Sequence, residues 1–131
     1  MNLRFAGYAA IFGKRDAGRD TIRPGAFART LAARQQPIPL CWQHRADLRI
    51  GWVERIGEDR RGLRVVASID NPDGGAASAL ERGEVTGLSF GYRTRASQVT
   101  AQGRELLDVD LIEVSLVTYP MQHDARVHLI V

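Results

Sequence analysis

The stretch Gly87-Leu88-Ser89-Phe90-Gly91-Tyr92 lies in the middle of residues 86–95, whose alternating apolar and small residues are typical of a β-strand. Successive side chains of a strand point to opposite faces of its sheet. The three large apolar side chains of this stretch therefore share one face, which we expect to be the core face. Ser89 lies on the other face, where its neighbours two residues away on either side are glycines.

Six other segments have the composition and alternation of strands, namely residues 3–12, 40–44, 49–56, 63–69, 106–119 and 127–131. Residues 13–24 are rich in glycine and charge, which predicts a surface loop. Residues 96–103 are a polar turn that suits a hairpin between the two longest strands.

Two helices are expected, at residues 26–34 and 75–82. Asp73 is the expected N-cap of the second helix, and Gly83 is its expected end. The chain therefore has six or seven strands and two helices, without a regular alternation of strand and helix. This order predicts a β-rich α+β domain: an antiparallel curled sheet or barrel of six to seven strands with two or more outer helices.

A length of 131 residues, with 44% hydrophobic and 25% charged residues, predicts a single globular domain over residues 1–131. No apolar run reaches the roughly 20 residues that span a bilayer, and the N-terminus lacks the pattern of a signal peptide. We therefore expect synthesis in the cytoplasm and no membrane association. The single cysteine, Cys41, excludes an internal disulfide, and its apolar neighbours favour a buried side chain over a reactive thiol.

The net charge of +3 arises from 18 basic and 15 acidic residues, and every basic residue except Lys14 is an arginine. Acidic residues are interspersed with the basic ones, as in Glu58-Asp59-Arg60-Arg61. Nucleic-acid-binding proteins usually concentrate basic charge on one face or stripe. The scattered charge favours a mixed, solvated surface and argues against nucleic acid as the partner.

Ser89 is the first candidate for chemistry because Gly87 and Gly91 flank it on its own face of the strand. Two glycines clear a patch of backbone that another peptide chain can approach closely. Such a patch suits the nucleophile of an acyl transfer, with Gly87 and Gly91 as substrate-binding residues. The alternative is that the serine and its glycines mark only a bulge or a tight corner of a barrel.

His44 ends the apolar strand predicted at residues 40–44 and is expected to share a face with Leu40 and Trp42. Apolar packing behind the imidazole would hold its orientation while one ring nitrogen stays accessible. Such a histidine is the usual general base near neutral pH. The alternative is a rim histidine whose hydrogen bonds are satisfied by its neighbours. His123 and His128, close to the C-terminus, are weaker candidates.

Glu113 lies in residues 111–117, a run that is apolar on both faces of the predicted strand. A carboxylate there is costly unless it is paired or hydrogen-bonded. A histidine partner would satisfy this carboxylate, and the carboxylate would in turn fix the tautomer of the imidazole. The alternative is an ion pair between Glu113 and an arginine. Ser115 lacks flanking glycines and is interpreted as a packed strand serine.

The histidines lack metal-ligand spacing, so no metal or other cofactor is predicted.

Four groups of residues, in this order and at these spacings, resemble the motifs of the tailed-phage prohead proteases, also called capsid maturation proteases. They are residues 7–12 with 22–27, residues 42–44 with 50–51, residues 87–92, and residues 113–120. The matching stretches run from the first strand to Pro120 and so cover most of the chain. The resemblance implies the fold that this family is expected to share with the herpesvirus assemblins.

The resemblance also implies a serine endopeptidase that works inside the assembling procapsid of a phage, prophage or gene transfer particle, in the host bacterial cell. Its substrate would be the major capsid protein with its scaffold segment. On this basis Ser89 attacks the scissile carbonyl, and His44 acts as general base and later as general acid. Glu113 takes the third role, in which assemblins have a histidine. Assemblin-like enzymes can depend on dimers, so a homo-oligomer is compatible with the resemblance.

A second hypothesis remains open from the residues alone. The sequence pI of about 9.6 and the many arginines are also compatible with a non-catalytic β-barrel module that binds capsid protein or nucleic acid. Salt-dependent binding to nucleic acid that survives the loss of Ser89 and His44 would favour this second hypothesis.

Overall fold

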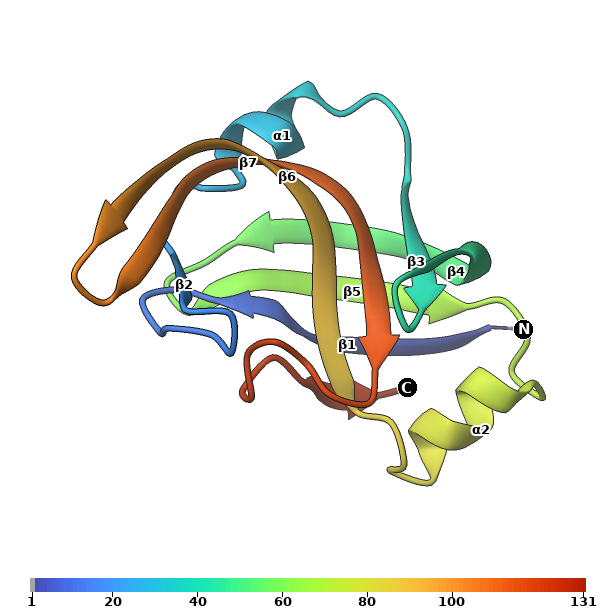
Figure 1. Cartoon of the computed structure of the whole chain (residues 1–131). Coiled ribbons are helices and arrows are strands. Elements are labelled where there is room, and N and C mark those ends of the chain that lie inside the picture. The colour runs from blue at the N-terminus through green and yellow to red at the C-terminus, as the bar shows by residue number, and fades with distance from the viewer. Residues whose placement is uncertain (1) are drawn as a thin grey trace.

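The computed structural model describes residues 2–131, which form a curled β-sheet with two short helices (Figure 1). The strands are β1 (Leu3–Ile11), β2 (Asp20–Ile22), β3 (Ile38–Trp42), β4 (Arg45–Glu58), β5 (Gly62–Ile69), β6 (Gly87–Thr100), β7 (Gly103–Val117) and β8 (Val127–Ile130). The helices are α1 (Ala28–Ala33) and α2 (Gly75–Glu81). Within residues 2–131, no helix has the length and apolar character needed to cross a membrane.

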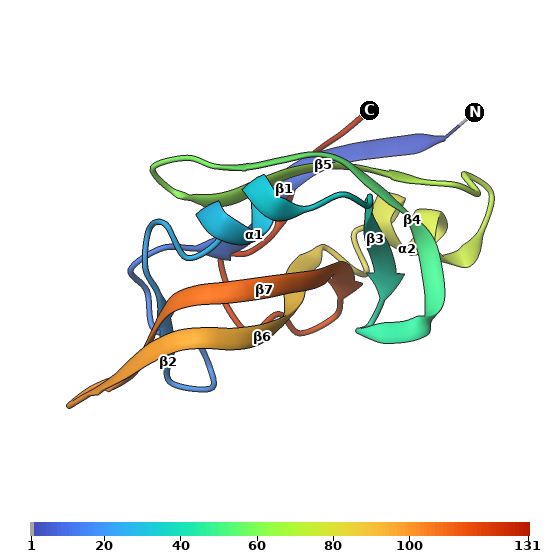
Figure 2. The same ribbon diagram turned by 90° about the horizontal axis from the view of Figure 1, so that it is seen from above.

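The strands follow the order β2-β7-β3-β4-β5-β1-β8, and β6 pairs with the free side of β7. One wall of the molecule is formed by β1, β4 and β5, and the long β6–β7 hairpin passes over it as a second wall (Figures 1 and 2). The two walls are joined through β3, which pairs with β4 on one side and with β7 on the other. The sheet is thereby curled into a half-barrel.

The prediction of a purely antiparallel sheet is wrong, because β7 pairs in parallel with both β2 and β3. The predicted number of strands is also too small: eight strands lie within residues 2–131, and the additional one is β2. β2 lies in the segment predicted as a charged loop. Its pairing with β7 is accompanied by an ion pair between Asp20 and Arg104, which a local hydrophobic pattern cannot reveal.

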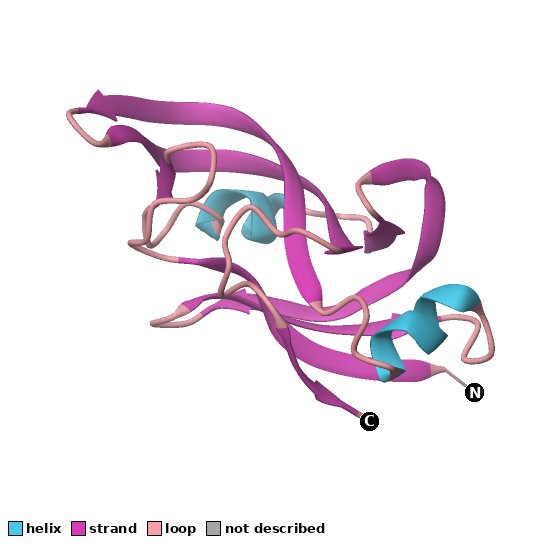
Figure 3. Ribbon diagram, turned by 60° about the horizontal axis from the view of Figure 1, so that its bottom comes forward, coloured by secondary structure: helices cyan, strands magenta, loops and turns pink. Residues whose placement is uncertain are grey.

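Both helices occur where they were expected, with α1 near the β6–β7 hairpin and α2 near the start of β1 (Figure 3). The predicted N-cap of α2 is wrong: Gly74 occupies that position, and no side chain caps the helix. Asn71 instead accepts a hydrogen bond from the backbone N–H of Asp73, so a turn formed by Asn71 leads into the helix. Gly83 has a φ of 74°, which is typical of the residue that ends a helix.

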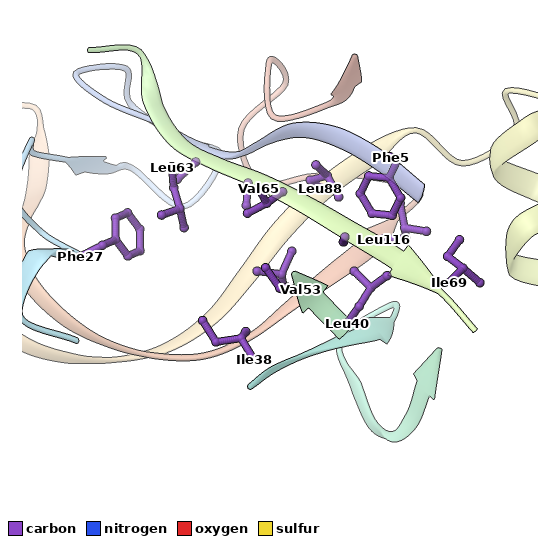
Figure 4. Packing of buried hydrophobic residues seen from close by; sticks show 14 of the residues in the cluster. Phe5, Phe27, Ile38, Leu40, Val53, Leu63, Val65, Ile69, Leu88 and Leu116 are labelled. Atoms are coloured by element: carbon purple, nitrogen blue, oxygen red, sulfur yellow. The ribbon is translucent and has the colours of Figure 1, made fainter. Parts of the chain in front are cut away.

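The core fills the space between the two walls (Figure 4). Phe5, Leu40, Leu63, Leu88 and Leu116 come from five different strands, and each is at most 1% exposed. Burying such a side chain contributes about 1.5–3 kcal/mol to stability. This core therefore provides the main force that holds the β6–β7 hairpin over the opposite wall.

The core face of β6 is the one predicted from alternation. Leu88 is fully buried, and Phe90 and Tyr92 pack against the core. The ring of Phe90 meets the ring of Phe27 edge-on, with the centroids 5.1 Å apart. Ser89 consequently lies on the opposite face of β6.

The closeness of neighbouring strands leads to a test of the fold at Gly51 in β4. A methyl group on Gly51 would run into the backbone carbonyl of Ser68 in β5, whereas a methyl group on Gly57, in the same strand, would meet nothing within 4 Å. Gly51→Ala should therefore lower the free energy of unfolding by about 1–3 kcal/mol. Gly57→Ala should leave it unchanged or raise it by up to about 1 kcal/mol. Urea unfolding followed by circular dichroism measures both, and equal stability of the two variants would contradict the observed strand packing.

Candidate active site

The site begins at the two-residue turn that joins β3 to β4. β3 ends at Trp42, and Trp42 pairs with Arg45 across the turn. Gln43 and His44 have φ values of 53° and 61°, so both residues adopt the left-handed conformation. Positive φ at both central residues is the pattern of a type I′ hairpin turn, which usually contains asparagine and glycine. Two larger residues in this conformation store backbone strain of about 1–2 kcal/mol each.

This turn corrects the prediction for His44. The residue was expected to end a strand and to share a face with Leu40 and Trp42, but it is the second residue after β3 and lies in the left-handed region. The strict alternation of a strand does not apply there, so the direction of the imidazole is set by the turn. Short turns with positive φ and without glycine have a weak sequence signal, which is why the pattern could not reveal this one.

Hydrogen bonds to β7 and the residue that follows it hold the strained turn in place. The backbone N–H of Gln43 donates to the carbonyl of Leu116 at 2.9 Å. The Gln43 side chain donates to the Thr118 hydroxyl at 2.7 Å and accepts from the Thr118 N–H at 3.1 Å. The backbone N–H of His44 donates to the Ser115 hydroxyl at 3.1 Å. These four bonds fix the turn against the strand that carries Glu113.

The imidazole of His44 is hydrogen-bonded to the carboxylate of Glu113, with Nδ1 and Oε1 2.6 Å apart. The side chain of Glu113 is only 11% exposed, whereas that of His44 is 40% exposed. The costly buried carboxylate predicted at position 113 therefore has a histidine partner in the structure, and not an arginine. With Nδ1 directed at the carboxylate, Nδ1 carries the proton and Nε2 is the nitrogen left to accept another one.

The hydrogen bond to Glu113 raises the pKa of His44 above its ordinary value, and this effect outweighs burial, which lowers the pKa. A raised pKa in the folded state means that the pair stabilises the fold fully at pH values below the unfolded pKa of about 6.5. This stabilisation is lost as the pH rises through the folded pKa. Conversely, the neutral imidazole that a general base requires becomes the predominant form only above the folded pKa.

Ser89 lies next to this pair. In the antiparallel pairing of β6 with β7, Ser89 is directly opposite Ser115, and Gly91 is directly opposite Glu113. Residues directly opposite in such a pair have Cβ atoms about 4.5–5.5 Å apart on the same face of the sheet. Ser89 is 5% exposed, and it shares this face with Ser115 and Glu113. The predicted histidine, serine and glutamate, which are distant in sequence, therefore belong to one small region of the fold.

The two glycines that flank Ser89 make room for other parts of the protein. A methyl group on Gly91 would overlap the carboxylate of Glu113. A methyl group on Gly87 would overlap the carbonyl of Val117 and the ring of Pro120. The predicted open patch around Ser89 is therefore filled on both sides, and the glycines allow Glu113 and the turn after β7 to approach β6.

The remaining candidates lie apart from this pair or are enclosed. His123 lies beside Arg126, and the ring of His128 packs edge-on against Tyr8. Cys41 is 2% exposed, as expected for a buried cysteine, and burial together with the nearby charge of Glu113 raises its pKa. Among residues 2–131, no group of three or more His, Cys, Asp or Glu side chains is arranged to hold a metal ion.

Sequence reasoning missed the parts played by Gln43, Thr118 and Ser115. Gln43 and Thr118 lie inside the motifs that suggested the family, but their mutual hydrogen bonds join residues 75 positions apart. Ser115 was interpreted as a packed strand serine, and its complete burial confirms that part of the interpretation. Its hydrogen bonds to both members of the His44–Glu113 pair became apparent only from the register of β3 and β7.

Residues 1–131 match the family described as caudovirus prohead serine protease, and the chain belongs to that family. The chain is 30% identical, over 130 residues, to the prohead protease of Enterobacteria phage HK97. That match covers 94% of this chain and 58% of the phage protein, so the chain spans little more than half the length of this relative.

The fold is also similar to solved structures of herpesvirus proteases. The protease of KSHV, solved in complex with a hexapeptide phosphonate inhibitor, superposes with a TM-score of 0.68 at 13% identity, over 97% of this chain and 64% of that one. The varicella-zoster virus protease has a TM-score of 0.61 at 20% identity, over 98% and 64% of the two chains. The expected fold relationship to the assemblins is confirmed.

The packing of Gly91 against Glu113 can be tested without an activity assay. In Gly91→Ala the new methyl group should push the carboxylate away from His44, so the pKa of His44 should fall toward about 6.5. NMR titration of the imidazole measures this shift. Gly57→Ala serves as the matched control and should leave the His44 pKa unchanged. An unaltered His44 pKa in Gly91→Ala would show that the carboxylate does not depend on the space at Gly91.

Proposed function

We propose that this chain acts as a serine endopeptidase that processes the major capsid protein and its scaffold segment during procapsid maturation. The observation that carries this proposal is the hydrogen bond from His44 Nδ1 to the buried carboxylate of Glu113, next to the strand position of Ser89. Membership in the prohead protease family supports the same function. The site of action would be the interior of the assembling procapsid in the host bacterial cell, and assembly into a homo-oligomer stays a prediction.

In this mechanism the hydroxyl oxygen of Ser89 attacks the scissile carbonyl while Nε2 of His44 accepts the hydroxyl proton. The imidazolium that forms is stabilised by the carboxylate of Glu113, which is already hydrogen-bonded to Nδ1. His44 then gives the proton to the leaving amine, and an acyl-enzyme remains on Ser89. Water activated by His44 hydrolyses this ester and regenerates the serine. The chemistry uses only groups of the chain and water, so we propose no cofactor.

The non-catalytic hypothesis has less support from the surface charges. Several arginines that the sequence left available for nucleic acid are paired with carboxylates. Arg29 contacts both Asp108 and Asp110, and Arg95 contacts Asp110 as well. Paired arginines of this kind present little excess positive charge to a phosphate backbone.

Replacement of the proposed nucleophile is the direct test of the function. Ser89→Ala should abolish cleavage of the capsid precursor when the chain is co-expressed with its capsid protein, because no other group replaces the attacking hydroxyl. Mass measurement of the N-terminus of the capsid protein follows the cleavage. Ser68→Ala removes another buried strand serine, on β5, and this variant should cleave the capsid precursor as the wild type does. Unchanged cleavage by Ser89→Ala would end the proposal.

The pH dependence of labelling by a fluorophosphonate tests the base. The rate should follow the neutral form of His44 and rise with pH through a midpoint above about 6.5, because Glu113 raises the His44 pKa. Glu113→Gln should move this midpoint to lower pH, since the negative charge is lost. It should also slow labelling about 10²- to 10⁴-fold, because the ring loses the partner that orients it. Identical pH profiles for the two proteins would contradict the role of Glu113.

A further inference from the structure

We propose that Ser115 is a positioning residue, whose one hydroxyl aligns both partners of the His44–Glu113 pair. The inference rests on the proposed function for its effect on catalysis. Its structural part, the alignment of the pair, is testable independently of any activity.

The hydroxyl of Ser115 bonds to both partners at once. It donates to Oε2 of Glu113 and accepts the backbone N–H of His44 at 3.1 Å. Ser115 has no exposed surface. A serine hydroxyl has one proton to donate, and that proton is used by Glu113. Ser115 is therefore unsuited to be a second nucleophile. Both hydrogen bonds of its hydroxyl are made with Glu113 and His44.

The bond to Glu113 sets the orientation of the carboxylate. A glutamate carboxylate can rotate about its last torsion with few preferences. Because Oε2 is held by Ser115, Oε1 is the oxygen presented to Nδ1 of His44. The bond also satisfies a lone pair of the Glu113 carboxylate, whose side chain is only 11% exposed, and thereby lowers the cost of burying its charge.

The bond to the backbone of His44 sets the position of the imidazole. His44 is in the left-handed region, where a residue of its size stays only if neighbouring groups hold it. The Ser115 hydroxyl accepts the N–H of this residue, and thereby ties the turn to β7. The donor and the acceptor of the His44–Glu113 hydrogen bond are thus both located relative to the same oxygen atom.

Ser115 is also the cross-strand neighbour of Ser89. The register of β6 and β7 therefore locates the proposed nucleophile relative to the atom that aligns the base and its carboxylate. A buried serine with a purely packing role would make no such set of contacts, and Ser68 on β5, which is 5% exposed, offers a comparison of similar burial outside the site.

The experiment compares Ser115→Ala with Ser68→Ala in the full chain. In Ser115→Ala the pKa of His44, measured by NMR, should fall toward about 6.5, because Glu113 is no longer held toward the ring. The second-order rate constant for fluorophosphonate labelling should fall about 10- to 100-fold, by analogy with the loss seen when the hydrogen-bonding partner of a metal-ligating histidine is removed. Ser68→Ala should change neither quantity. An unchanged His44 pKa and labelling rate in Ser115→Ala would overturn the proposal.

A double-mutant cycle with Glu113→Gln separates positioning from general packing. If Ser115 acts through Glu113, the effect of Ser115→Ala on labelling should be much smaller in the Glu113→Gln background than in the wild type. Additive losses would overturn the proposal.

The wild-type protein provides a further readout should Ser115→Ala fail to fold. Its Ser115 hydroxyl proton should be visible by NMR and its His44 amide protected from exchange, and the absence of both would overturn the proposal as well.

These measurements also separate this inference from the proposed function. A wild-type chain that is never labelled would count against the protease proposal, whereas the His44 pKa in Ser115→Ala would still decide whether Ser115 aligns the pair. A wild-type chain that is labelled normally, with a Ser115→Ala variant that matches it in rate and in His44 pKa, would leave the protease proposal intact and refute the positioning role.

Discussion

The parallel pairing of β3 with β7 is the constraint on which the rest of the site depends. Only three residue pairs, from Leu40 with Val114 to Trp42 with Leu116, make this contact. They join the wall of β4, β5 and β1 to the β6–β7 hairpin, and they bring the end of β3 beside Glu113. The left-handed turn then extends the contact by four hydrogen bonds, so one short seam both closes the half-barrel and aligns the His44–Glu113 pair.

The turn at Gln43 and His44 illustrates how a site can retain unfavourable local geometry. Asparagine and glycine would adopt this turn with less strain, yet neither could supply an imidazole. The β3–β7 pairing ends at Trp42, and beyond it the Gln43 side chain makes two hydrogen bonds with Thr118. These bonds offset the strain of the turn. The stability of the fold and the ability of His44 to accept a proton also respond to pH in opposite ways. Because the pKa of His44 is raised, low pH favours the charged imidazole paired with Glu113, and high pH favours the neutral imidazole that can accept a proton.

The sequence predicts the faces of individual strands well and their partners poorly. The core face of β6 and the partner required by Glu113 could be inferred, since both follow from the alternation or burial of single side chains. The parallel pairing of β7, the strand at Asp20–Ile22 and the left-handed turn could not, because each depends on residues distant in the chain. The glycines were recognised for the right reason, close approach, but the groups that approach are Glu113 and Pro120 of the same chain.

The two members of the pair are separated by 69 positions, and they lie on opposite sides of the seam between β3 and β7. A ribosome-bound chain that has emerged only as far as β6 contains the imidazole and the Ser89 hydroxyl but has no carboxylate to orient the ring. A molecule in which β7 has detached, while β1, β4 and β5 remain folded, still contains this carboxylate but no longer holds it against the ring. The His44–Glu113 pair therefore requires β7 to be docked against β3, and it is lost when that strand comes loose.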